Sequence, residues 1–166
     1  MIKNQASTKL RMAAFALALT SSPATVFAQA SGIEGLWIDH TGRGAVEIKA
    51  CGANGRMCGY LVWLQEPNFK DGRPLTDGNN PSPGLRKRPI CGLPIITNMA
   101  RLGDGSYDNG KIYDPEKGET FDVAAKLLAK DQLQITGYLG VKFLSETFKW
   151  RRATTALARC DGPKAI

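Results

Sequence analysis

The chain has 166 residues, of which 43% are hydrophobic and 22% are charged, and its formal net charge is +7. A chain of this length normally makes one domain with a single core. Its Lys and Arg residues are not gathered into the dense stripe typical of nucleic-acid binding, so no nucleic-acid partner is expected.

The first thirty residues have the pattern of a secretory signal peptide. Three basic residues precede an apolar run, and small residues then lead to Ala28 and Ala30. We expect residues 1–28 to be the signal peptide, with cleavage after Ala28 or Ala30, and a periplasmic or secreted protein. Its removal takes away three positive charges and no acidic residue, which leaves a net charge of +4. No apolar run approaches the roughly 20 residues needed to cross a bilayer, so no membrane span is expected.

Residues 31–153 are expected to form one β domain, and residues 154–166 a C-terminal tail. After a first strand at 32–38 and a turn at 39–44, two alternating apolar runs flank a Gly- and Asn-rich turn, which predicts a hairpin. Cys51 and Cys58 close this hairpin. Because export favours oxidation, we expect them to form a disulfide. A zinc site is the alternative, but His40 is the only histidine and the spacing is unsuitable, so no metal is expected.

The other two cysteines, Cys91 and Cys160, leave two arrangements open. They either pair with each other and tie the middle of the chain to the tail, or Cys160 lies in a loose tail. The sequence does not decide between these arrangements.

Residues 65–89 are expected to form one long loop, because they contain five prolines and two Asp-Gly turns. Long loops in compact domains are often functional, and this one ends with Arg86 and Arg88. An extended backbone before Pro89 would place both side chains on one side, where they could meet one anionic group. Alternatively, they hold the loop by hydrogen bonds to its own carbonyls. Lys111 and Tyr113 likewise have two alternatives, since each lies either at the barrel rim or in a pocket.

Alternation resumes after the loop in short runs separated by turns, with Gly137 and Gly140 marking a bend. About eight strands are expected in all, with no helix pattern between them. The prediction is therefore an all-β fold, an antiparallel up-and-down barrel, with a two-sheet sandwich as the alternative. A barrel of eight strands either fills its interior with side chains or holds one small ligand.

Several motifs recur across the whole mature chain in the order of a known family. The chain resembles the DUF2147 family in Gly35-x-Trp37, Ile48-x-x-Cys51, Cys58-Gly59-x-x-Val62-Trp63-Leu64, Asn80-Pro81-x-Pro83, Leu85-Arg86-x-Arg88-Pro89, Gly110-x-Ile112-Tyr113-x-Pro115 and Trp150-x-Arg152. The resemblance implies an exported bacterial protein with a lipocalin-like (calycin) barrel and no settled biochemical role. It also implies that Trp37 packs under a guanidinium from the last strand, that of Arg151 or Arg152, which closes one end of the barrel.

Features of an enzyme are weak, since His40 lies in a turn and the chain contains no Gly-x-Ser-x-Gly motif. We expect neither a catalytic residue nor a cofactor. The leading hypothesis is an exported barrel that binds a small apolar or amphipathic ligand in the cell envelope, such as an anionic amphiphile, with Arg86 and Arg88 near its mouth and Trp63 against the ligand. The alternative is a protein–protein interaction module of the cell envelope, with a filled barrel and no ligand.

Overall fold

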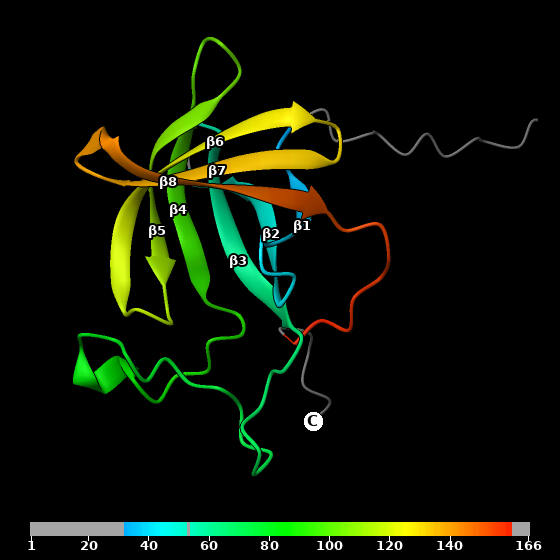
Figure 1. Cartoon of the computed structure of the whole chain (residues 1–166), viewed down its shortest axis with the longest axis vertical. Helices are drawn as coiled ribbons and strands as arrows, with labels where there is room; N and C mark the ends of the chain where they lie inside the picture. The colour runs from blue at the N-terminus through cyan, green and yellow to red at the C-terminus, as the bar shows by residue number, and fades with distance from the viewer. Residues whose placement is uncertain (1–31, 53, 161–166) are drawn as a thin grey trace, which may run out of the picture.

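The protein is a closed barrel of eight antiparallel strands, each paired with the next and the last paired with the first (Figure 1). The computed structural model describes residues 32–160 apart from residue 53, so the signal peptide predicted at residues 1–28 lies outside the described residues. The up-and-down barrel is confirmed, and the sandwich is excluded. The strands are β1 Gly35–Ile38, β2 Gly44–Cys51, β3 Arg56–Leu64, β4 Pro94–Arg101, β5 Tyr107–Asp114, β6 Glu119–Ala129, β7 Gln132–Leu139 and β8 Val141–Arg152.

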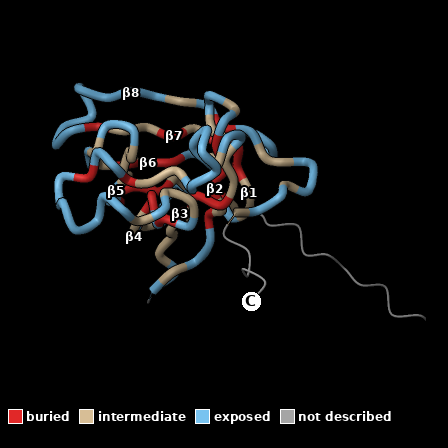
Figure 2. The backbone as a smooth tube through the Cα atoms, turned by 90° about the horizontal axis from the view of Figure 1, so that it is seen from below, coloured by how far each residue is buried: buried red, intermediate tan, exposed pale blue. Residues whose placement is uncertain are grey.

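Alternation along the strands places apolar side chains inside the barrel, as pleated strands require. Val46 and Ile48 of β2 and Leu133 and Ile135 of β7 are each about 1% exposed or less. Figure 2 shows buried stretches on most of the strands, whereas most of β8 is exposed. β8 contributes to the hydrophobic core only near its C-terminal end, through Trp150 and through Phe148, which packs against the core.

One end of the barrel is closed by Trp37 and Arg152. Trp37 is fully buried and donates a hydrogen bond from Nε1 to the carbonyl of Ile33. The guanidinium of Arg152 lies 4.1 Å from the indole centroid and donates hydrogen bonds to the carbonyls of Gly32, Glu34 and Lys130. A guanidinium on an indole face gains a cation–π contact. Of the two arginines proposed for this role, Arg152 therefore performs it.

The opposite end carries the connections β1–β2, β3–β4, β5–β6 and β7–β8, because alternate loops of an up-and-down barrel lie at the same end. The β3–β4 connection is the long loop expected from the prolines, and it extends below the strands in Figure 1. It contains one short 3-10 helix, η1, Pro83–Leu85. Gly137 lies within β7, and only Gly140 is at the β7–β8 turn, so the bend expected at Gly137 is wrong.

Both cysteine pairs are bonded. Cys51–Cys58 closes the β2–β3 hairpin as predicted, and Cys91–Cys160 joins the long loop to the tail, which selects the first of the two arrangements left open. The amide of Cys160 also donates a hydrogen bond to the carbonyl of Val62. The described part of the tail is thus fixed against β3 at Cys160.

Replacing both Cys51 and Cys58 by serine should lower the free energy of unfolding by about 2 to 3 kcal/mol, because the unfolded chain regains the entropy of an open loop. Urea unfolding of the wild type and of the double variant measures this difference. Labelling of both thiols in unreduced, natively folded protein would contradict the assignment.

β8 has a partner strand along only one of its edges over most of its length. It pairs with β7 from Val141 to Arg151, but with β1 only through Arg151 and Arg152. The β7–β8 tip, residues 139–144, has four apolar side chains that are 59% to 94% exposed, of which Phe143 is the most exposed. The barrel wall is therefore open beside β8, next to the exposed tip.

Candidate ligand-binding cavity

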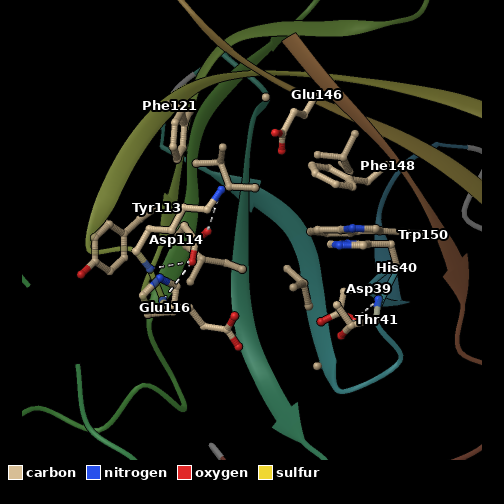
Figure 3. Close-up of a pocket in the computed structure, with 18 of the residues that line it drawn as sticks. Asp39, His40, Thr41, Tyr113, Asp114, Glu116, Phe121, Glu146, Phe148 and Trp150 are labelled. Atoms are coloured by element: carbon tan, nitrogen blue, oxygen red, sulfur yellow. Dashed lines mark hydrogen bonds and ion pairs between the residues drawn. The ribbon is translucent and has the colours of Figure 1, made fainter. Parts of the chain in front are cut away.

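A cavity of about 810 Å³ lies at the end of the barrel opposite Trp37 (Figure 3). Small-molecule sites commonly have volumes of roughly 300 to 1,000 Å³. The inner wall is apolar and buried, and consists of Val46, Leu61, Ile95, Ile135 and Trp150. The barrel interior is therefore only partly filled, and it has room for one small molecule.

Aromatic rings form much of the cavity wall. Figure 3 shows Phe121 of β6 on one side of the cavity and Phe148 and Trp150 of β8 on the other. The ring of His40, from the β1–β2 turn, stacks on Phe148 with the centroids 4.2 Å apart and the planes at 26°. His40 is exposed, as a turn residue is expected to be, but its ring also lines the cavity. Sequence reasoning missed this second role.

Charged side chains lie at the mouth of the cavity, where most of them are paired. Arg43 forms an ion pair with Glu116 at 3.1 Å, and Lys117 lies 3.9 Å from Asp114. Asp39 accepts hydrogen bonds from the amide and hydroxyl of neighbouring Thr41 in the β1–β2 turn. These contacts fix the two turns that border the mouth.

Asp77 organises the long loop beside the mouth. Its side chain is fully buried and accepts hydrogen bonds from Tyr113 Oη at 2.5 Å, from Asn80 Nδ2 at 2.8 Å and from Arg88 Nε at 2.9 Å. Burial raises the pKa of Asp77, but the hydrogen bonds from Tyr113, Arg88 and Asn80 outweigh it, so the pKa lies below its ordinary value. The loop is thereby attached to β5 through Tyr113.

The structure separates the residues that the sequence proposed as a ligand site. Arg88 binds Asp77, Arg86 donates from Nε to the carbonyl of Asn80 at 2.7 Å, and Lys111 pairs with Asp122 on the neighbouring strand. Tyr113 lines the cavity, whereas half-buried Trp63 and the two arginines do not.

The expected extended backbone at Arg86 is wrong. This residue follows η1 and has helical dihedrals, φ −65° and ψ −19°. The contacts of Arg86 and Arg88 are those of residues that hold the loop together, and their binding of a ligand stays a prediction.

A second buried carboxylate, Asp108 of β5, holds the β7–β8 tip in place. It accepts a hydrogen bond from Tyr138 Oη at 2.7 Å and contacts Lys142 Nζ. Burial and the bond to Asp108 raise the pKa of Tyr138 to about 12. Burial raises the pKa of Asp108, but the bonds from Lys142, Tyr138 and the Asn109 amide outweigh it and lower that pKa overall.

The lowered pKa of Asp108 predicts a pH dependence of stability. A carboxyl with a depressed folded-state pKa stabilises the fold above its unfolded pKa, and this contribution is lost as pH falls through the folded value. We expect the free energy of unfolding to fall as pH drops below about 4, the region where unfolded Asp titrates, and to fall less steeply in Asp108→Asn. Urea unfolding between pH 3 and pH 6, on the order of the span in which carboxyl groups titrate, measures both slopes; equal slopes would contradict the role of Asp108.

Two kinds of site are absent from the part of the chain that the structure describes. Within residues 32–160, apart from residue 53, no three His, Cys, Asp or Glu side chains are arranged to hold a metal ion. In the same residues, no helix has the length and apolar character needed to cross a membrane.

Comparison with known proteins gives a family and a fold. No curated protein matches the chain. Among solved structures, the barrel is similar to protein HP1028 from the human pathogen Helicobacter pylori, which is described as belonging to the lipocalin family. The TM-score is 0.61 at 25% sequence identity, over 74% of this chain and 83% of that chain. Residues 35–152 match the model of a family described as uncharacterized and conserved in bacteria, and the chain therefore belongs to the DUF2147 family.

Proposed function

We propose that this protein is exported and binds a small apolar or amphipathic ligand in the cell envelope. The observation that carries the proposal is the cavity of about 810 Å³, with buried apolar side chains on its inner wall and charged side chains, none of them buried, elsewhere in its lining. Such a distribution suits a molecule with an apolar body and a polar end. The lipocalin-like fold is compatible with this use.

Export is supported by the signal-peptide pattern of residues 1–28 and by the two disulfides, which persist in oxidising compartments. Fractionation of cells expressing the full chain tests it, together with N-terminal sequencing of the processed protein. A new N-terminus after Ala28 or Ala30 in the periplasmic or secreted fraction is expected. An intact N-terminus in the cytoplasm would refute export.

Gly137 offers a direct test of ligand binding. It lines the cavity, a Cβ atom added there meets nothing within 4 Å, and its φ is not positive, so a larger side chain would enter the open space without backbone strain. Gly137→Phe should fill part of the cavity and remove any ligand retained during purification. Native mass spectrometry of wild type and variant, both purified without detergent, measures the retained adduct.

The matched control is Thr136→Phe, which adds the same ring at the neighbouring residue of β7, outside the cavity lining. We expect the control to keep the adduct, and the melting temperature of Gly137→Phe to stay close to that of the wild type. If wild-type protein carries no adduct and binds no alkyl probe, the proposed function is wrong.

The alternative function, an interaction module, is favoured by one observation, the exposed β7–β8 tip. Contiguous exposed apolar side chains on a soluble protein often mark a contact with another molecule. Val141→Ser separates the two functions, because it removes an apolar side chain of the tip, 60% exposed, that does not line the cavity, whereas Phe143 does. Loss of a co-purifying protein, with the cavity of the wild type empty of ligand, would support the interaction module.

A further inference from the structure

We propose that the cavity selects a ligand whose polar end is cationic, an ammonium group on an apolar body. The inference rests on the proposed ligand binding and adds the charge of the ligand. The proposed ligand charge is opposite to the negative charge that Arg86 and Arg88 led us to expect. The guanidinium groups of these arginines bind Asn80 and Asp77 within the long loop.

The first observation is the charge balance of the cavity lining. Among the described residues, its charged side chains are the four carboxylates of Asp39, Asp114, Glu116 and Glu146 and the two cations of Arg43 and Lys117. Each cation is matched to a carboxylate, Arg43 to Glu116 and Lys117 to Asp114. The carboxylate of Asp39 is occupied by Thr41. Glu146 is the carboxylate left without a hydrogen-bond or ion-pair partner in the described part of the chain.

The second observation is the position of Glu146 on β8. Phe148 and Trp150 follow it at intervals of two, so all three share the strand face that lines the cavity. A charged side chain interrupts an otherwise apolar series there. Figure 3 shows its carboxylate between Phe121 and Phe148 in projection, at the edge of the cavity.

The third observation is the space in front of this carboxylate. Glu146 pairs in register with Gly137 of β7, which has no side chain to cover it. A Cβ atom at Gly137 would meet nothing within 4 Å. A ligand group therefore has access to the carboxylate from within the cavity.

These features together match the chemistry of an organic cation. An ammonium group can donate charge-assisted hydrogen bonds to Glu146 while its carbon substituents contact the apolar lining beside this carboxylate. The apolar body then lies against the buried inner wall. An anionic end in the same place would be repelled by Glu146 and would find Arg43 and Lys117 already paired.

The test compares three probes that share one apolar chain and differ in charge: decylammonium, decanol and decanoate. Each is titrated calorimetrically into the full mature protein at pH 7, below the concentration at which it forms micelles. We expect decylammonium to bind about tenfold more tightly than the other two, the size of one charge-assisted contact in a partly solvated site. Glu146→Gln should remove this preference and leave the affinity for decanol unchanged.

The control is Glu34→Gln, which makes the same change in net charge at an exposed residue beside the closed end of the barrel. It should keep the preference for decylammonium. Equal binding of all three probes, or tighter binding of decanoate, would overturn the cationic assignment while the proposed function stands. Binding of none of the three would overturn both. A preference that survives Glu146→Gln would overturn the role assigned to this carboxylate, while the proposed function stands.

Discussion

Trp37→Ala should lower the free energy of unfolding by about 3 to 5 kcal/mol, the range for removing a large aromatic side chain from a core. The indole is fully buried, its Nε1 donates to Ile33, and Arg152 covers its face. The substitution therefore leaves a void under a guanidinium that keeps its carbonyl contacts but loses its ring. Urea unfolding monitored by far-UV circular dichroism measures the change.

The two neighbouring arginines provide the control for this prediction. Arg152→Ala removes three hydrogen bonds to carbonyls and the cation–π contact, and should cost about 2 kcal/mol or more. Arg151 is exposed, and Arg151→Ala should change stability by less than about 0.5 kcal/mol. A loss below about 1 kcal/mol in Trp37→Ala, or equal losses for the two arginines, would contradict the closing role.

Asp77→Ala should destabilise the protein by about 3 kcal/mol, because removal of one member of a buried ion pair leaves its partners unsatisfied. Tyr113, Asn80 and Arg88 all lose an acceptor, although Arg88 is about one third exposed and regains water. We also expect the long loop to become more sensitive to protease, since the bond from Tyr113 to Asp77 is one of the contacts that attach it to β5. Unfolding curves and limited proteolysis measure the two effects.

Asp71→Ala is the matched variant, since Asp71 lies in the same loop and pairs with Arg73 at the surface. Exposed ion pairs contribute roughly 0 to 1 kcal/mol, so this change should hardly alter the free energy of unfolding. If Asp77→Ala is as mild as Asp71→Ala, or leaves the loop resistant to protease, the attachment of the loop does not depend on the buried carboxylate.

Much of the fold follows from local sequence, because alternating apolar and polar residues indicate a strand and turn residues indicate a hairpin. The β2–β3 hairpin and its Cys51–Cys58 bond are of this kind, and both were predictable. Gly137 shows the limit of this reasoning, since a glycine in a strand looks like a bend unless one knows that it faces a cavity. The family resemblance supplied the closure by Trp37, but the choice between Arg151 and Arg152 depended on which side chain faces inward.

The candidate site was less predictable, because it is assembled from residues far apart in the chain. His40 and Phe148 stack across a separation of more than one hundred positions, which no local pattern records. Arg86 and Arg88 were prominent because they are charged and close together, but Asp77, the partner of Arg88, looked like an ordinary turn residue in Asp77-Gly78. Burial decided its role. Whether a loop charge faces a ligand or another loop residue depends on tertiary packing alone.

The packing of Arg152 on Trp37 also determines when the barrel can finish folding. Arg152 Nη1 reaches the carbonyl of Glu34, 118 positions earlier in the chain, so the closing contact forms only after nearly the whole chain is available. Contacts of such long sequence separation make folding slow, because the entropy of closing the loop is lost before the contact stabilises the fold. Until β1 and β8 meet, both strands present unpaired backbone groups. A nascent chain that stops before Arg152 therefore remains an open sheet with two free edges, the form most exposed to aggregation and proteolysis.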